Sequence, residues 1–401
     1  MRNEYLNIVS ANSCTGCGAC SAICPKQCIS VIHDRYGFRM PMVDLDTCIH
    51  CCLCERTCPV RKLDDSHNTL MPLKVIVAKN LNREIAAVSS SGGIFSVFAE
   101  YILKKDGVVY GVALSKELKA IHIRVNNINS LSKIRGSKYL HSNAAKAYSS
   151  VKEDLKAKKN VLFSGTPCQI AALKQFLRKD YSNLLCIEVV CHGVPTDRAF
   201  NKYIEYLQSR HKSRVTSVNF RDKSKGWNDN CISFTFENGK KFLQRGADNL
   251  YTQGYVNNLF VRDCCTACQF KNMKSGADIT LGDMWGIESI LPTYPKDCGV
   301  SMVCINSLVG ENAFRNIELE LSDCIEVSYE SVKKYNECIW RSVRSHEKRI
   351  FFLQNCNEEY FDRLIKESLN INVITITKRK IKKVRKTVIS SIIKIKHLYL
   401  H

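Results

Sequence analysis

Cysteine is the residue type in this chain whose number and spacing could do chemistry, because the 401 residues include 22 cysteines. Ten of them lie between residues 14 and 58, in two runs of the same spacing. The first run is Cys14-x2-Cys17-x2-Cys20-x3-Cys24-Pro25, and the second, 34 residues later, is Cys48-x2-Cys51-x2-Cys54-x3-Cys58-Pro59. Thiolates are soft ligands that suit the iron of iron–sulfur clusters, and each cubane needs four ligands. The internal duplication therefore predicts two metal clusters.

The two runs resemble the bacterial two-cluster ferredoxins, in which three close cysteines and the last cysteine of the other run hold each 4Fe–4S cluster. We therefore expect two ligand sets: Cys14, Cys17, Cys20 and Cys58 for the first cluster, and Cys48, Cys51, Cys54 and Cys24 for the second. Zinc and disulfides are the alternatives, but zinc sites usually pair CxxC motifs without a CxxxCP end, and disulfides are rare in the cytosol. Cys28 and Cys52 lie outside the pattern, and we expect both to be small buried hydrophobic residues.

A Ser/Gly-rich loop precedes a predicted helix in the part of the chain behind these cysteines. The loop is Ser89-Ser90-Ser91-Gly92-Gly93, and the apolar spacing over 94–102 predicts an amphipathic helix. The first backbone N–H groups of a helix are unpaired and lie at its positive end, so this loop could bind an anion. Plain helix capping by serine is the alternative.

Strand, helix and strand follow one another over residues 160–193. We expect a strand at Val161–Gly165, a turn at Thr166-Pro167-Cys168-Gln169, a helix opening at Ile170–Leu177 and a strand at Leu184–Val190. Such a βαβ unit indicates a parallel sheet with ligand sites at the C-terminal strand ends, where Cys168 and Cys191 would lie. Cys265-x2-Cys268 has metal-ligand spacing, although a zinc half-site or a thioredoxin-like redox pair would compete.

Six stretches in order resemble the coenzyme F-420 hydrogenase/dehydrogenase beta-subunit family, over roughly residues 70–310. They are SSSGGIFS at 89–96, GSKYLHS at 136–142, LFSGTPCQIAAL at 162–173, EVVCHGVPT at 188–196, FRDKSKGW at 220–227 and RDCCTACQFKNMKSGADITLGDMWG at 262–286. Members of this family share a bound FAD with a 4Fe–4S cluster beside it. The resemblance therefore implies a flavin and a third cluster.

The same resemblance implies the residues of these sites. Flavin contacts are implied for Ser90, Ser91, Gly92, Gly93, Ser137, Lys138, Tyr139, Thr166 and Pro167, and ligation of the third cluster for Cys168, Cys191, Cys265 and Cys268. Structural thiols are the alternative for these four cysteines. Cys265 is preferred over its neighbour Cys264 because it lies three residues after Arg262, as in the family motif.

Two residues are candidates for catalysis, although no catalytic role is assigned. Lys138 could hold the pyrophosphate or stabilise the reduced flavin anion, with a solvated surface lysine as the alternative. His192 could deliver a proton because histidine titrates near neutral pH, with a satisfied buried histidine as the alternative. Asp283 and Trp285 are expected to be packing and turn residues. The remaining cysteines match no ligand spacing and are interpreted as structural: Cys186, Cys231, Cys298, Cys304, Cys324, Cys338 and Cys356.

Composition excludes several classes of protein. Apolar residues make up 45% and charged residues 24%, which is typical of a globular protein and excludes a disordered chain. No apolar run approaches the ~18 residues of a membrane helix, no secretory signal follows Met1, and we expect a cytoplasmic protein. The formal net charge is +21, but no zinc finger or helix-turn-helix accompanies it, so nucleic acid is not an expected partner.

The C-terminal 29 residues, 373–401, hold nine Lys/Arg and no acid. Ile381, Val384, Val388 and Ile392 recur at helical spacing, which predicts a basic amphipathic helix. Such a helix could bind an anionic membrane surface, so peripheral attachment at the inner face of the membrane is one expectation. A solvated or disordered tail, or docking onto an acidic partner, is the alternative.

These features predict an α+β multi-domain protein, with a small bacterial-type two-cluster 4Fe–4S ferredoxin domain before an α/β flavin-binding domain with βαβ units. The expected divisions are 1–62 for the ferredoxin domain, 63–72 for a linker, 73–155 and 156–310 for the two parts of the flavin domain, 311–372 for a helical extension and 373–401 for the tail. The expected function is an FAD- and 4Fe–4S-dependent oxidoreductase. Electrons would pass between the ferredoxin clusters and FAD, and a hydride would pass to or from an organic substrate or a deazaflavin.

Two other functions compete with this one. The chain could be an electron-transfer subunit for a separate catalytic partner, including one in surface polysaccharide biosynthesis, or a basic accessory protein whose clusters are structural. The expected partners are a redox partner protein or ferredoxin and a small-molecule hydride donor or acceptor. The flavin motifs favour the redox functions over the accessory one.

Overall fold

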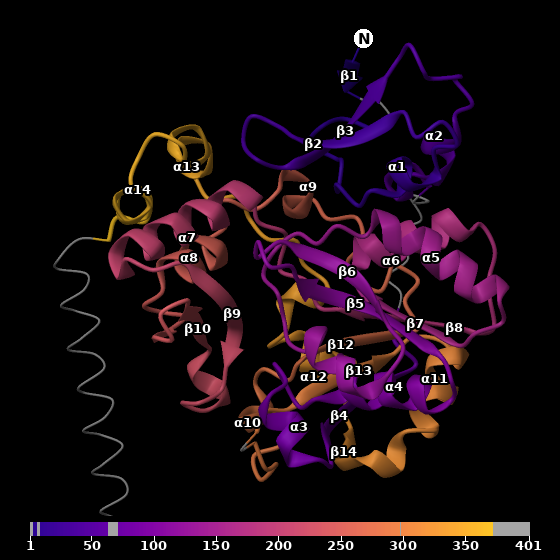
Figure 1. The fold of residues 1–401 in the computed structure, drawn as a ribbon. Helices are drawn as coiled ribbons and strands as arrows, with labels where there is room; N and C mark the ends of the chain where they lie inside the picture. The colour runs from indigo at the N-terminus through magenta and orange to yellow at the C-terminus, as the bar shows by residue number, and fades with distance from the viewer. Residues whose placement is uncertain (1–2, 6–8, 63–70, 297, 372–401) are drawn as a thin grey trace, which may run out of the picture.

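The computed structural model describes residues 3–5, 9–62, 71–296 and 298–371. The basic tail expected over 373–401 and most of the expected linker lie outside the described residues. Within the described part, the protein is an α+β structure built on three sheets (Figure 1).

The N-terminal module carries the duplicated cysteine runs on a small antiparallel sheet. Its strands are β1 (Asn3–Tyr5), β2 (Ile29–His33) and β3 (Arg39–Asp44), in the order β1-β3-β2. Each cysteine run continues into one short helix, α1 (Ala19–Ile23) or α2 (Leu53–Thr57). The repeat in the sequence is therefore also a repeat in the structure.

An eight-stranded mixed sheet forms the centre of the large domain, in the order β14-β4-β13-β12-β8-β7-β5-β6. Its strands are β4 (Lys74–Asn80), β5 (Val108–Leu114), β6 (Ala120–Val125), β7 (Val161–Gly165), β8 (Leu184–Val189), β12 (Ile279–Asp283), β13 (Ser301–Ile305) and β14 (Leu321–Glu326). The four strands β5, β7, β8 and β12 run parallel, whereas the flanking pairs are antiparallel. The C-terminal ends of the parallel strands therefore meet at one edge, where ligands bind in such sheets.

The expected βαβ unit is present as β7, α6 (Pro167–Leu177) and β8, with Val161 paired to Leu184. The helix begins at Pro167, three residues earlier than expected, so Pro167 is not a turn residue. Thr166 and Gln169 form a capping box at its start, and proline suits the first helical position because its missing N–H has no partner there anyway.

Helices cover both faces of this sheet. On one face, α5 (Ala145–Lys156) and α6 pack on alternate residues of β5 and β7 and lie below the N-terminal module. On the other face, α4 (Ile94–Lys104) and α11 (Leu308–Arg315) pack on the intervening residues. The short helices α3 (Arg83–Ala87), α10 (Ile287–Ile290) and α12 (Tyr329–Lys333) lie near the β4 and β13 side of the sheet (Figure 1).

A third, antiparallel sheet forms a separate lobe beside the main sheet (Figure 1). Its strands are β9 (Val215–Asp222), β10 (Cys231–Phe236) and β11 (Lys241–Arg245), and its helices are α7 (Asp197–His211), α8 (Leu250–Val256), α13 (Arg349–Asn355) and α14 (Phe361–Ser368). The rings of Tyr203 on α7 and Phe361 on α14 lie 5.3 Å apart in its core.

The segment 311–372 is only in part the helical extension that the sequence led us to expect. Its helices α13 and α14 do pack on the lobe, but residues Leu321–Glu326 form β14, an edge strand of the main sheet. Only Leu321 of this strand is buried, so the two-residue alternation that identifies a strand is too weak to predict it.

The N-terminal module packs closely against the large domain, and two glycines permit the contact. Gly16 has φ 65° and Gly18 has φ 82°, a left-handed conformation that favours glycine. A Cβ atom at Gly16 would lie 2.8 Å from Cε1 of His141, and one at Gly18 would lie 3.1 Å from Cβ of Ala145. The first of the clusters expected in this module, whose cavity Gly16 and Gly18 line, would therefore lie close to the large domain.

Candidate functional site

The first expected ligand set lines one cavity of the N-terminal module. Cys14, Cys17, Cys20 and Cys58 all face it, although Cys58 comes from the second run. Cys17 is buried, and this burial raises the pKa of its thiol to about 11. The fold therefore exchanges the fourth cysteine between runs, as the ferredoxin spacing predicts.

A positively charged lining suits this cavity to an anionic cluster. Arg39 lines it, and Nη1 of Arg262 lies 3.0 Å from the position of a Cβ at Gly16, another lining residue. Nη1 of Arg39 and Nη1 of Arg262 are both buried, and neither has a hydrogen-bond partner among the described residues. The sulfides of a bound cubane accept such N–H groups, so the residues present fit a 4Fe–4S cluster.

The second expected ligand set, Cys24, Cys48, Cys51 and Cys54, lines a second cavity. Cys28 and Cys52 line the same cavity, which six cysteines therefore share, and Sγ of Cys28 lies 3.3 Å from Sγ of Cys24. Cys28 is thus a further thiol at this site rather than an inert core residue. Cys52 is exposed, which corrects the expectation that it is buried. It is the N-cap of α2, with a left-handed φ of 55°, and its exposed side chain lies at the edge of the same cavity. Among the described residues, no three His, Cys, Asp or Glu side chains are close enough together to hold a single metal ion. A cubane is larger than one ion, so its four thiolates lie farther apart than the ligands of a single ion.

We expect Cys17→Ser and Cys51→Ser each to remove one cubane from anaerobically purified protein and to destabilise the N-terminal module, because serine oxygen is a poor ligand for this iron and the clusters hold the module together. Iron analysis and EPR of the reduced protein would measure the loss. Cys52→Ser is the matched control, since its exposed thiol lines the second cavity but belongs to neither expected ligand set. Full iron content and unchanged EPR signals in both variants would contradict the assignment.

The third expected ligand set gathers at the ligand-binding edge of the main sheet. Cys168 lies in the first turn of α6, Cys191 follows β8, and Cys265 and Cys268 lie on and after α9 (Asp263–Thr266). The thiol of Cys191 is close enough to those of Cys265 and Cys268 for their charges to affect its ionisation, and the thiol of Cys168 is likewise affected by Cys191 and Cys268. Burial raises the pKa of Cys168, Cys191 and Cys268.

Cys264 is also near this group, but its thiol and that of its neighbour Cys265 differ in pKa. A hydrogen bond from Cys264 lowers the pKa of the Cys265 thiol to about 7, and the same contact raises the pKa of Cys264. The backbone N–H of Val194 also donates to Sγ of Cys265, over 3.5 Å. Cys265 is therefore the thiol of the pair that is best supported as a thiolate ligand.

Lys271 is a buried cation beside these thiols that the sequence did not single out. Its Nζ donates to the backbone carbonyls of Cys191, at 2.5 Å, and Cys338, at 2.6 Å. Its charge stabilises the ionised forms of Cys191, Cys265 and Cys268, which suits an anionic cluster. Its position in the stretch after the CxxC carries no signal that distinguishes it from other lysines.

The first and third thiol groups are close to each other. The thiol of Cys168 is near enough to that of Cys17 for each to influence the ionisation of the other, and both influence the buried hydroxyl of Tyr148 on α5. The Tyr148 hydroxyl donates to the Cys17 carbonyl over 3.1 Å. This arrangement would provide a short path between a cluster in the module and one at the sheet edge.

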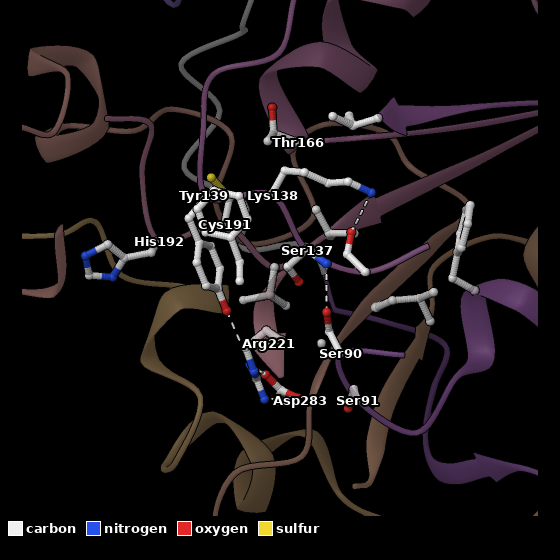
Figure 2. Close-up of a pocket in the computed structure, with 18 of the residues that line it drawn as sticks. Ser90, Ser91, Ser137, Lys138, Tyr139, Thr166, Cys191, His192, Arg221 and Asp283 are labelled. Atoms are coloured by element: carbon white, nitrogen blue, oxygen red, sulfur yellow. Dashed lines mark hydrogen bonds and ion pairs between the residues drawn. The ribbon is translucent and has the colours of Figure 1, made fainter. Parts of the chain in front are cut away.

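A cavity of about 520 Å³ opens at the same edge, which is within the size range of small-molecule and cofactor sites. Figure 2 shows Cys191 and Tyr139 on one side of it and Ser90, Ser91 and Ser137 on another. The expected flavin residues that line it are Ser90, Ser91, Gly93, Ser137, Lys138, Tyr139 and Thr166. Gly92 and Pro167 do not line it: the N–H of Gly92 donates to Oγ of Ser301 over 2.9 Å, and Pro167 is buried in α6.

A hydrogen bond joins the Ser/Gly-rich loop that precedes α4 to the loop that carries Ser137. The backbone N–H of Ser137 donates to Oγ of Ser90 over 2.7 Å (Figure 2). Nζ of Lys138 donates to the carbonyls of Arg135 and Gly136, at 2.9 and 3.1 Å, and burial lowers the pKa of this lysine to about 7. Lys138 is therefore not a solvated surface lysine, because its Nζ is bonded to carbonyls of its own loop; its role toward a flavin stays a prediction.

The N-terminus of α4 faces this cavity and is the part best suited to an anion. Gly93 is its N-cap, with φ 86° and no side-chain cap, so the first N–H groups of an 11-residue helix are not satisfied by a capping side chain. Arg135 also lines the cavity and donates from Nε to Oγ of Ser96 in the first turn, over 2.9 Å. The positive end of the α4 dipole and the guanidinium of Arg135 lie side by side, so together they suit the negatively charged phosphates of a flavin nucleotide.

Arg221 lies deep in the cavity wall in an arrangement that the sequence analysis missed. It is 8% exposed, its Nη1 lies 2.7 Å from Oδ2 of Asp283, and it also donates to the Tyr139 hydroxyl (Figure 2). Trp227 donates to the other oxygen of Asp283 and stacks on Trp285, with ring centres 5.1 Å apart. Asp283 therefore fixes a buried cation at the cavity.

Comparison with known proteins finds one matching family for the N-terminal module and one for the large domain. Residues 158–330 match the family described as the C terminus of the beta subunit of coenzyme F420 hydrogenase/dehydrogenase, and residues 13–62 match the 4Fe–4S dicluster domain. The resemblance to the F420 hydrogenase/dehydrogenase beta-subunit family is confirmed. The chain thus has a match to a two-cluster ferredoxin domain followed by a match to the C-terminal part of the beta-subunit family, and the two matches together support a redox role.

Individual relatives of the beta-subunit domain and of the ferredoxin domain are distant. The chain is 22% identical to one subunit of the F420H2 dehydrogenase of Methanosarcina mazei, over 90% of this chain and 98% of the relative. It is 38% identical to an iron–sulfur subunit of the CoB–CoM heterodisulfide reductase of Methanocaldococcus jannaschii, over 12% of this chain and 10% of that protein. A solved structure of the F420-reducing NiFe hydrogenase complex from Methanosarcina barkeri aligns with a TM-score of 0.45 and 17% identity, over 79% of this chain and 96% of that chain. None of the helices in the described residues has the length and apolar character needed to cross a membrane.

Proposed function

We propose that the chain is an iron–sulfur flavoprotein oxidoreductase that relays electrons between ferredoxin-type 4Fe–4S clusters and FAD, with hydride transfer to or from an organic substrate or a deazaflavin. The observation that carries the proposal is the continuity of the sites. The first thiol group is within electrostatic range of the third through Cys17 and Cys168, and Cys191 of the third group lines the 520 Å³ cavity.

Different residues of the chain would bind the clusters, balance their charge and bind the flavin. The twelve cysteines would hold three clusters, and Arg39, Arg262 and Lys271 would balance their negative charge. The N-terminus of α4 and Arg135 would hold the flavin phosphates. A bound flavin would exchange single electrons with clusters and a hydride with the substrate. The buried Arg221–Asp283 pair would orient the ring system or the substrate in the cavity.

Anaerobic purification followed by a visible spectrum tests the proposal. A bound flavin that is reduced when the clusters are reduced supports it, and a protein that keeps its clusters but neither contains nor binds flavin contradicts it. A screen of hydride donors and acceptors, with a deazaflavin among them, would then identify the substrate class.

For Arg135→Gln we expect flavin affinity to fall about tenfold, because one charge-assisted hydrogen bond to a phosphate contributes about 1.5 kcal/mol. Flavin fluorescence during titration of flavin-depleted protein would measure the dissociation constant. Arg210→Gln on α7 is the matched control, since its guanidinium contacts Tyr206 at an exposed position. Equal affinity in both variants would show that the phosphates bind elsewhere.

The second candidate function is an electron-transfer subunit for a separate catalytic partner. The name of the Methanosarcina mazei relative, which is one subunit of a dehydrogenase and matches over 90% of this chain, favours it. Turnover of a hydride donor or acceptor by the isolated chain would support the first function, and turnover that appears only with a partner protein would support the second.

The basic tail is proposed as a peripheral membrane contact, on its sequence alone. Deletion of residues 373–401 is expected to abolish binding to anionic vesicles, because it removes nine cationic side chains, each worth about 1 kcal/mol near such a surface. Co-sedimentation with vesicles of anionic and of neutral lipids would measure this. If the truncated protein binds as the full chain does, the tail has another role.

A further inference from the structure

The stretch FRDKSKGW at 220–227 carries a lysine that the proposed function leaves unused. Lys223 follows the last residue of β9 in the lobe, and its side chain reaches the segments around the main sheet. Its Nζ donates to the carbonyls of Ala86 at 2.8 Å, Ser91 at 2.5 Å and Cys298 at 2.6 Å. These carbonyls belong to the end of α3, to the Ser/Gly-rich loop and to the segment before β13. One ammonium group therefore joins three such segments to the lobe.

The three donors of this ammonium group all have acceptors, and these acceptors are neutral. A lysine has three N–H donors and no acceptor, so its hydrogen-bonding capacity is filled here. Because backbone carbonyls carry no full charge, they hold the group in place without neutralising it. Burial lowers the pKa of Lys223 to about 8, so at neutral pH the group is still mostly the ammonium ion. Gly299, with φ 93°, makes room for it, since a Cβ there would lie 3.1 Å from Nζ of Lys223.

The Ser/Gly-rich loop that Lys223 contacts forms part of the wall of the 520 Å³ cavity, which Ser91 lines. Lys223 is not among the described residues that line it, so it acts on the cavity only through the loop. The loop is also fastened to the start of β13. Oγ of Ser91 donates to the carbonyl of Val300 over 2.6 Å, and the N–H of Gly92 donates to Oγ of Ser301 over 2.9 Å. The hydroxyl and the carbonyl of Ser91 are therefore both bonded, and Lys223 holds the carbonyl.

We propose that Lys223 is a positioning residue of this cavity, and that it fixes the Ser/Gly-rich loop in the conformation that binds the phosphates of the flavin nucleotide. The choice of ligand rests on the proposed function. The hydrogen bond keeps the Ser91 carbonyl turned toward the lysine, because an oxygen with a negative partial charge would repel a phosphate if it faced the cavity. The ammonium charge also lies near the start of α4, three residues after Ser91, and adds to the positive end of that helix.

The end of β9 contributes to the cavity twice, so the lobe and the main sheet build this site together. Arg221 pairs with Asp283 at the cavity wall, and Lys223, two residues later, holds the loop. A lysine that only stabilised the packing of the lobe would affect all flavins equally when removed. A lysine that positions the loop for phosphates would affect a flavin that carries phosphate more than one that has none. This difference separates the two roles.

Lys223→Met in the anaerobically purified full chain tests the proposal, because methionine keeps the length of the side chain and removes the ammonium group. In flavin-depleted protein we expect the amides of residues 89–96 to exchange hydrogen about tenfold faster than in the parent. The dissociation constants of FMN and FAD, from fluorescence titration, should rise about tenfold, and that of riboflavin less than about twofold. Lys223→Arg keeps the charge and the donors and should restore most of both. Lys225→Met, at an exposed lysine of the same loop, is the matched control and should behave as the parent.

Unchanged exchange of residues 89–96 in Lys223→Met, or an FMN affinity equal to that of the parent, overturns the positioning role. Equal losses of affinity for FMN and riboflavin overturn the role toward phosphate, because the lysine then supports the cavity as a whole. If melting temperature and iron content show that Lys223→Met does not fold, Lys223→Gln replaces it, since glutamine keeps an N–H donor without the charge. A parent chain that binds no flavin overturns the proposed function and the role toward phosphate with it. The exchange measurement needs no flavin and still decides whether Lys223 holds the loop.

Discussion

Cys265→Ala is expected to lower the iron content by about four atoms and to stop reduction of bound flavin by the ferredoxin clusters, while both ferredoxin EPR signals remain. Cys265 is the thiol of its pair that accepts the N–H of Val194 and whose pKa is lowered. Cys191, its near neighbour, lines the cavity that is proposed to bind the flavin. Without a third cluster, the first thiol group has no relay to this cavity, so electron transfer should fall by orders of magnitude although flavin still binds.

Cys264→Ala is the matched control, because it removes the adjacent thiol from the same short helix. Iron analysis, EPR and stopped-flow flavin reduction would compare the two variants. Equal iron content and normal flavin reduction in Cys265→Ala would decide that these thiols are structural and that the ferredoxin clusters reduce flavin directly. Loss of iron in Cys264→Ala alone would move the ligand to the neighbouring residue.

The sequence predicted those parts of the site that are set by local spacing. The ligand sets of the two ferredoxin cavities follow from cysteines three and four residues apart, and they line two separate cavities as expected. The unit β7–α6–β8 was predictable because buried strands and a capped helix have strong local patterns. The same reasoning placed Cys168 and Cys191 at one sheet edge.

The parts that the sequence did not predict depend on contacts between distant segments. Sγ of Cys338 lies 3.8 Å from Nδ1 of His192 although 146 residues separate them, and no local pattern in either segment indicates the other. Arg221 and Asp283 pair across 62 residues, and Lys271 reaches two loops at once. Lys138 lines the cavity as the family motif implied, but the hydrogen bonds of its ammonium group to carbonyls of its own loop could not be predicted from the motif.

Arg262→Met is expected to destabilise the docked module by about 3 kcal/mol and to slow electron transfer from the ferredoxin clusters to the third cluster. Arg262 is 3% exposed and comes from the beta-subunit domain, yet its Nε donates to the Cys14 carbonyl at 2.6 Å and its Nη2 to the Arg39 carbonyl at 2.8 Å. Its charge also lowers the pKa of Cys265. One buried guanidinium therefore lies between the first and third thiol groups, holds the module in place and balances the charge of both.

Arg262→Lys separates these two contributions, because lysine keeps the charge but cannot reproduce both hydrogen bonds of the planar guanidinium. If charge dominates, the lysine variant should retain most of the electron-transfer rate while it loses stability. If the docking geometry dominates, both variants should lose the rate together. Thermal unfolding under anaerobic conditions and stopped-flow reduction of the third cluster would distinguish the two. An unchanged melting temperature and rate in the methionine variant would mean that the module is held by its other contacts, of which the ion pair of Arg39 with Asp197, at 2.9 Å, is the next to test.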